Sequence, residues 1–140
     1  MLISLGTAYN DRPEFYRAVL DTAAEQPWHV VLSVGDQVDR ASLPTAARNV
    51  EMHASVPQLA VLAEAAAFVT HAGMGSTMEA LAAGVPLVAI PQMAEQRANA
   101  DRIVELGLGR ALAPDGLDPG TLWATVAEVA ADLHVRERLG

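Results

Sequence analysis

The stretch FVTHAGMGSTMEALAAGVPLVAIPQMAEQRANA, residues 68–100, joins two very apolar runs of the chain through a polar, glycine-rich turn. It opens as a buried strand that ends near His71, passes Gly73 and Gly75, and then has the composition of a helix that stops at Gly84. A second apolar strand follows at residues 85–91. A strand, a turn and a helix in this order predict an α/β unit whose loop lies at the end of a strand.

The same alternation continues on both sides of this stretch. The expected strands are residues 1–6, 28–34, 49–54, 66–71, 85–91 and 109–113. The expected helices are residues 13–26, 57–65, 75–84, 95–107 and 118–133, followed by a helical tail at 134–140. Strands that are apolar on both faces and alternate with helices indicate a parallel sheet with right-handed crossovers. The sequence therefore predicts one α/β domain, a Rossmann-like three-layer sandwich with a roughly six-stranded parallel sheet.

Composition excludes several classes of function. The 140 residues contain no cysteine, which removes disulfides, a thiolate nucleophile and cysteine-ligated metal, and fits a reducing cytoplasm. No apolar run approaches the ~20 residues that a membrane span needs. The net charge is −8 and every basic residue is arginine, so a P-loop lysine and Schiff-base chemistry are excluded and nucleic acid is not the expected partner.

The turn after residue 71 has the features of an anion site. In a parallel sheet, ligands bind beyond the carboxyl ends of the strands, where loops lead into helix N-termini. We expect Gly73 and Gly75 to let the backbone turn tightly, so that unpaired amides and the helix dipole face a ligand. Ser76 and Thr77 add hydroxyl donors, and His71 adds a donor or a positive charge. A phosphate or diphosphate is the expected ligand.

A purely structural interpretation stands beside this one: the two glycines serve only the turn, and Ser76 caps the helix. Other motifs are missing. Met78 occupies the place where a dinucleotide fingerprint needs Gly or Ala. The histidines lie far apart and no D-x-D occurs, so we expect no metal site.

The run SVPQLAVLAEAAAFVTHAGMGSTMEALAAGVPLVAIPQMAEQRANA, residues 55–100, resembles the signature of family 1 GT-B glycosyltransferases, and is most like bacterial macrolide and antibiotic glycosyltransferases. The flanking SLGTAYND and ANADRIVELGLGR extend the resemblance over most of the chain. It implies that residues 1–140 are the C-terminal half of a GT-B fold, the domain that binds the nucleotide-sugar donor. The N-terminal acceptor domain, which supplies the catalytic base, would be absent from this chain.

The resemblance also implies a role for individual residues. The donor diphosphate would be bound by His71, Gly73, Gly75, Ser76, Thr77 and Thr7. The nucleoside would lie against Ser55, Val56, Gln58 and Glu79, with Glu79 on the ribose hydroxyls. The donor sugar would contact Glu95 and Gln96, while Asn99 would order the loop.

One position departs from the family pattern. The family usually carries a tryptophan that stacks on the base, and Ser55 stands in its place. Losing a base–aromatic stack costs about 1–3 kcal/mol. Another residue must then pack against the base. The choice between a UDP-linked and a dTDP-linked donor stays open.

The implied reaction is inverting, metal-independent glycosyl transfer to a small natural product, which reaches the site through the missing domain. The donor is a substrate, and we expect no cofactor, membrane insertion or nucleic acid. A non-catalytic donor-binding subunit that works with a separate acceptor-binding chain is the alternative. A GT-B-like sugar-nucleotide epimerase and a dinucleotide oxidoreductase are less favoured.

Overall fold

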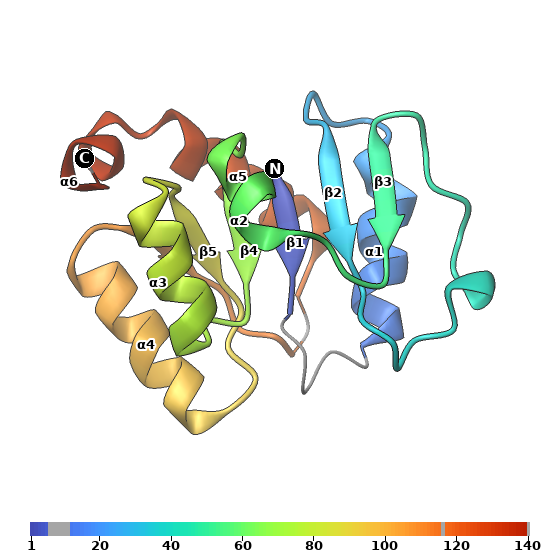
Figure 1. Cartoon of the computed structure of the whole chain (residues 1–140), viewed down its shortest axis with the longest axis horizontal. Helices are drawn as coiled ribbons and strands as arrows, with labels where there is room; N and C mark the ends of the chain where they lie inside the picture. The colour runs from blue at the N-terminus through green and yellow to red at the C-terminus, as the bar shows by residue number, and fades with distance from the viewer. Residues whose placement is uncertain (6–11, 116, 140) are drawn as a thin grey trace.

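The computed structural model describes residues 1–5, 12–115 and 117–139. Within these residues six parallel strands form one sheet in the order β3-β2-β1-β4-β5-β6 (Figure 1). The strands are β1 (Leu2–Ser4), β2 (Val30–Ser33), β3 (Val50–His53), β4 (Phe68–Thr70), β5 (Leu87–Ala89) and β6 (Gly109–Ala111). The sheet confirms the predicted α/β class and the number of strands.

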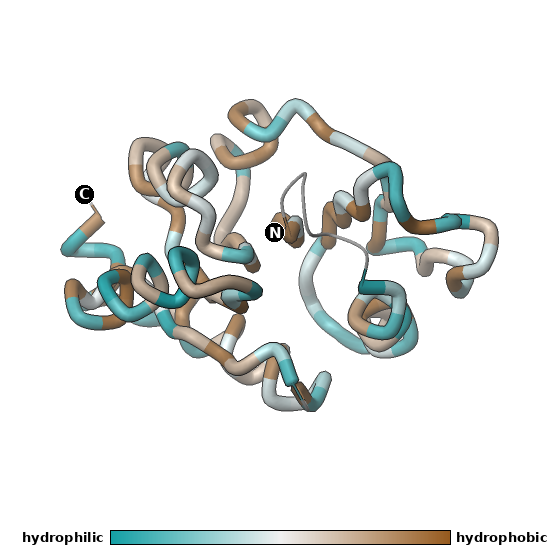
Figure 2. The backbone as a smooth tube through the Cα atoms, turned by 90° about the horizontal axis from the view of Figure 1, so that it is seen from below, coloured by the Kyte–Doolittle hydropathy of each residue, from teal (hydrophilic) through white to brown (hydrophobic). Residues whose placement is uncertain are grey.

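Helices cover both faces of the sheet, as the views in Figures 1 and 2 show. One face carries α1 (Pro13–Ala23) and α5 (Pro119–Ala131). The opposite face carries α2 (Gln58–Ala63), α3 (Met74–Ala82) and α4 (Ala94–Glu105). A short 3-10 turn (Arg40–Ser42) and the terminal helix α6 (Leu133–Leu139) complete the described elements. The predicted three-layer sandwich is therefore confirmed.

Alternation along the strands explains the two layers. In register across the sheet, Leu2 pairs with Phe68 and Phe68 with Leu87, and all three lie in the cluster under α2, α3 and α4. Their neighbours Ile3, Val69 and Val88 belong to the cluster under α1 and α5. Successive side chains of a strand point to opposite faces, so a strand buried on both sides must be apolar throughout.

The helices begin and end at proline, capping and glycine residues of the kind that the sequence offers there. Pro13 occupies the first turn of α1, and the Asp118 carboxylate accepts the amide hydrogen of Thr121 at 3.0 Å to cap α5. Gly84 and Gly107, which follow α3 and α4, have φ of 71°. The expected helix 118–133 ends earlier, at Ala131, because the Asp132 side chain accepts the amides of the next turn and starts α6 there.

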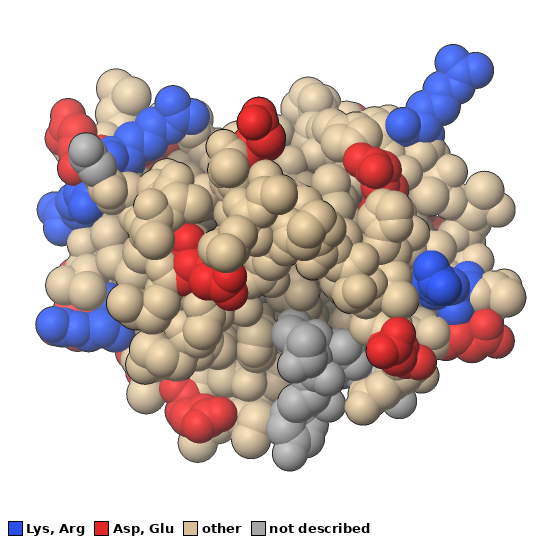
Figure 3. All heavy atoms as spheres, in the orientation of Figure 1, with Lys and Arg blue, Asp and Glu red and all other residues tan. Residues whose placement is uncertain are grey.

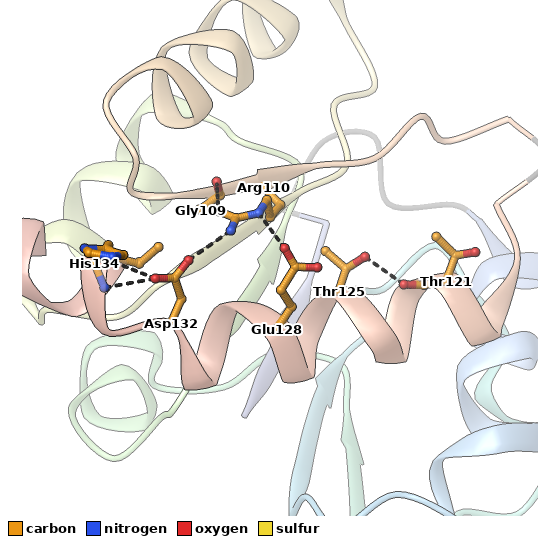
Figure 4. A network of polar contacts seen from close by, with 8 residues as sticks. Gly109, Arg110, Thr121, Thr125, Glu128, Asp132 and His134 are labelled. Carbon is orange, nitrogen blue, oxygen red and sulfur yellow. Dashed lines mark hydrogen bonds and ion pairs between the residues drawn. The ribbon is translucent and has the colours of Figure 1, made fainter.

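Two contacts attach α5 to the rest of the molecule. Trp123 is buried, and its indole N–H donates to Thr22 Oγ1 of α1 at 2.7 Å. Arg110, on the edge strand β6, bonds Glu128 at 3.0 Å and Asp132 at 2.9 Å (Figure 4). The first contact thus joins α5 to α1, and the second joins the C-terminal end of α5 to the edge strand β6.

No helix in the described part of the chain is long and apolar enough to cross a bilayer. On the face that Figure 3 shows, acidic side chains are scattered and arginines lie toward the margins.

Candidate functional site

A cavity of about 630 Å³ opens at the carboxyl ends of β1, β2, β3 and β4. Because β1 lies between β2 and β4, this is the point where the strand order reverses and where open α/β sheets bind ligands. The residues that line it are Ser4, Ser33, Gly35, Asp36, Gln37, Ala54, Ser55, Val56, Gln58, His71, Gly73, Gly75, Ser76 and Glu79. Most of the residues that sequence reasoning assigned to the diphosphate and nucleoside thus share one cavity.

The turn between β4 and α3 is built differently from the expectation. Its left-handed residue is Ala72, with φ of 67°, whereas Gly73 has an ordinary φ of −64°. Gly73 is needed for another reason: a Cβ there would lie 2.4 Å from Nε2 of His71. The histidine ring therefore packs over the Gly73 backbone, and a side chain at position 73 would displace it.

The N-terminus of α3 supplies free amides. The helix starts at Met74 with Gly73 as its cap, and its first hydrogen bond runs from the Thr77 amide to the Gly73 carbonyl at 2.9 Å. The amides of Met74, Gly75 and Ser76 precede that bond and have no partner within the helix. Ser76 does not cap the helix, so the expected capping role of this residue is wrong.

His71 is partly buried beside these amides. Burial lowers the pKa of His71 below its ordinary value, and the nearby charge of Glu95 opposes this by raising the pKa. The net direction is downward, so the imidazole is mostly neutral at pH 7. Of the two states open at the outset, a donor or a cation, the neutral donor is favoured.

Three side chains meet on the α2 side of the cavity. The amide nitrogen of Gln58 donates to Ser76 Oγ at 3.3 Å and to Glu79 Oε1 at 3.2 Å. Gln58 comes from the start of α2, and the other two come from α3. The contact joins the predicted diphosphate residue Ser76 to the predicted ribose residue Glu79, with a carboxylate available to accept from hydroxyl groups.

Other predicted residues lie apart from this group. Thr77 faces the core, and its hydroxyl is buried with no hydrogen-bond partner in the described ranges. Gln96 is also buried, and its Oε1 accepts the amide hydrogen of Gln92 at 2.8 Å. Glu95 is exposed near His71, and Thr7 lies outside the described residues. The ligand-binding roles of these four residues remain predictions.

Sequence reasoning missed several residues of the cavity wall. Ser4 and Ser33 end β1 and β2, and Asp36 and Gln37 follow β2. They carry no motif, but the rule that ligands bind at carboxyl ends of parallel strands could have indicated them.

A second cavity, of about 360 Å³, lies between the starts of α1 and α5 and is lined mainly by apolar residues such as Leu5, Phe15 and Ile90. It contains none of the predicted site residues. In the described ranges no group of three or more His, Asp or Glu side chains could hold a metal ion. The cavity at the strand reversal is therefore the better candidate site.

Residues 17–139 match the family described as "Erythromycin biosynthesis protein CIII-like, C-terminal domain". The chain is 46% identical over 139 residues to the NDP-glycosyltransferase YjiC of Bacillus licheniformis, and the alignment covers 99% of the chain and 35% of that protein. It is 41% identical over 140 residues to the oleandomycin glycosyltransferase of Streptomyces antibioticus, covering 99% of the chain and 33% of that protein.

Among solved structures, the calicheamicin glycosyltransferase CalG4 superposes with a TM-score of 0.92 at 46% identity, over 99% of the chain and 36% of CalG4. The chain spans about a third of the length of the curated relatives it matches.

Proposed function

Because the chain belongs to the Erythromycin biosynthesis protein CIII-like C-terminal domain family, we propose that it binds the nucleoside-diphosphate-sugar donor of a glycosyltransferase. The observation that carries the proposal is the shared cavity: His71, Ser76, Gln58 and Glu79 line it beside the free amides of α3. The named relatives are glycosyltransferases, including one for a macrolide, so a small natural product is the proposed acceptor class.

The proposed role of this domain in the reaction is electrostatic. When the acceptor hydroxyl attacks the anomeric carbon with inversion, the bond to the diphosphate breaks and negative charge grows on the leaving group. The amides of Met74, Gly75 and Ser76, the helix dipole and the N–H of His71 would stabilise that charge. In this proposal His71 and the amides do the work that a metal ion does in other transferases.

The nucleoside would occupy the part of the cavity between β3 and α2. Glu79 would accept from the ribose hydroxyls, with Gln58 holding the carboxylate in place. Ser55 and Val56 line the wall where the base would lie, and either a UDP-linked or a dTDP-linked donor is proposed.

The proposal assigns no general base to this chain, since His71 is engaged with the diphosphate. The catalytic base and the acceptor pocket would belong to the rest of a longer protein. The 140 residues alone should therefore bind donor with little or no turnover.

Calorimetric titration tests the proposal with the 140-residue chain and UDP, dTDP, their glucose conjugates, uridine and NAD. We expect the diphosphates and sugar conjugates to bind, equally well with EDTA present. His71→Ala should weaken UDP binding about 10- to 100-fold, because a hydrogen bond to a charged group contributes about 1.5–3 kcal/mol. Its effect on uridine should be small.

The matched control is His134→Ala, at a histidine whose side chain is 88% exposed on α6. It should bind UDP as the unaltered chain does. No nucleotide binding by a folded sample, tight binding of NAD, or equal losses of UDP and uridine in His71→Ala would contradict the proposal. Rapid transfer by the isolated domain would contradict the assignment of the base.

A further inference from the structure

The backbone bends sharply between β4 and α3, at a residue unsuited to the bend. Ala72 is fully buried, and among the described residues it is the one non-glycine with positive φ. A left-handed backbone brings Cβ of an L-residue close to its own carbonyl oxygen, so such a residue persists only where its surroundings hold it.

Two side chains hold Ala72, one on each side. The hydroxyl oxygen of Thr70 accepts the Ala72 amide hydrogen at 3.2 Å. The Ala72 carbonyl accepts from Nδ2 of Asn99 at 2.9 Å. Thr70 is fully buried at the end of β4, and Asn99 comes from the second turn of α4. The bend is thus fixed from two separate elements.

The Thr70 hydroxyl also lies 3.5 Å from Nδ1 of His71. A hydroxyl that accepts from the Ala72 amide through one lone pair can still donate its own hydrogen, here to Nδ1. An Nδ1 that accepts this hydrogen carries no proton, and the proton of the neutral imidazole is then on Nε2. Nε2 lies over Gly73, which lines the cavity.

We propose that Thr70 and Asn99 are positioning residues: they hold Ala72 in the left-handed conformation and keep His71 as the Nε2–H tautomer. The neutral ring then offers an N–H donor on the side of Gly73, where an Nδ1–H tautomer would offer only a lone pair. The diphosphate as recipient of this donor rests on the proposed function, whereas the bend and the tautomer do not.

The tautomer is tested by long-range ¹H–¹⁵N correlation spectra of the ligand-free chain at pH 8, where the ring nitrogens with and without a proton resonate far apart. We expect the proton of His71 on Nε2. Thr70→Val removes the hydroxyl at nearly constant volume and should give a mixture of tautomers, while Thr70→Ser should restore the single form.

The matched control is Thr125→Val on α5, whose hydroxyl donates to the Thr121 carbonyl (Figure 4). It should leave the His71 signals unchanged. A proton on Nδ1 in the unaltered chain would overturn the proposal even if Thr70→Val fails to fold. An unchanged tautomer in folded Thr70→Val would overturn it as well.

Asn99 is tested by comparing UDP with uridine. Asn99→Ala should lower the affinity for UDP about tenfold, leave uridine unchanged and shift the His71 ring signals. Asp101→Ala, on the exposed face of the same helix, is the control and should change none of these. Unaltered UDP affinity and unaltered His71 signals in Asn99→Ala would refute the positioning role. Failure of the unaltered chain to bind UDP would instead refute the proposed function, and the tautomer would still be decided by the spectra.

Discussion

His71 combines burial with a titratable group, and this links its site to pH. Burial lowers its pKa in the folded chain, so between that lowered pKa and about 6.5 the unfolded chain binds more protons than the folded one. The free energy of unfolding should therefore rise with pH across this window, and the contribution of His71 is lost as the pH falls through it.

Urea unfolding at pH 5, 6, 7 and 8 checks this prediction when the unaltered chain is compared with His71→Gln. The free energy of unfolding of the unaltered chain, minus that of His71→Gln, should increase as the pH rises to 7 and stay constant above it. Parallel curves from pH 5 to 8 would show that His71 does not titrate abnormally.

Single residues show where sequence reasoning reached its limit. His71 and Ser76 were predicted because their motif places them at one strand end and one helix start, whereas Gln58 and Glu79 were implied only by the family resemblance. The structure places all four along one cavity. The left-handed Ala72 was not predicted, since glycine is the usual residue for that conformation and two glycines stood nearby. Its holding contacts come from Thr70 and Asn99, and the latter is 27 residues away.

At the scale of elements, the sequence predicted every described α-helix and strand in type and order, but not the 3-10 turn Arg40–Ser42, and the predicted strands were too long. Residues 1–6 and 85–91 were expected as strands, and the paired segments are Leu2–Ser4 and Leu87–Ala89. An apolar run shows which residues are buried, whereas the ends of a strand depend on hydrogen bonds to neighbours that are distant in sequence.

The pairing of β5 and β6 gives a prediction at this scale. A Cβ on Gly109 would lie 1.9 Å from the backbone oxygen of Leu87, so the strands would have to separate to admit one. Gly109→Ala should lower the free energy of unfolding by about 3 kcal/mol, at the upper end for overpacking. Chemical unfolding followed by circular dichroism measures it.

The control is Gly75→Ala, where a Cβ would meet nothing within 4 Å. Alanine favours a helix over glycine by up to about 1 kcal/mol, so this variant should be as stable as the unaltered chain or more so. Equal destabilisation by both substitutions would mean that the close approach of β6 to β5 is not the cause.

For the molecule as a whole, the hydrogen bond between Trp123 of α5 and Thr22 of α1 joins two residues that are 101 positions apart in the sequence. Trp123→Phe should lower the free energy of unfolding by about 1–2 kcal/mol, through a lost buried hydrogen bond and a smaller side chain. A double-mutant cycle with Thr22→Val should give a coupling energy near 1 kcal/mol. A control cycle that combines Trp28→Phe, at a partly buried tryptophan, with Thr22→Val should give no coupling energy. Similar coupling energies in both cycles would contradict the Trp123–Thr22 contact.

The overall architecture was predictable because alternating strands and helices permit few arrangements, and a parallel sheet covered on both faces is the one that buries such apolar strands. The strand order was not predicted from the sequence, because β1, β2, β4 and β5 are all mainly apolar and no residue in them identifies the neighbouring strand. That order decides which loops meet, and so it also brought Asp36 and Gln37 into the cavity unpredicted.

The place of β1 has a consequence for how the chain acquires its shape on the ribosome. Leu2 precedes both of its partners along the chain, Val31 in β2 and Phe68 in β4, and these strands pair with opposite edges of β1. Parallel neighbours cannot form a local hairpin, so every pairing waits for a crossover to be synthesised. Until Thr70 has left the exit tunnel, β1 keeps one edge unpaired, and an unpaired strand edge favours aggregation of a nascent chain.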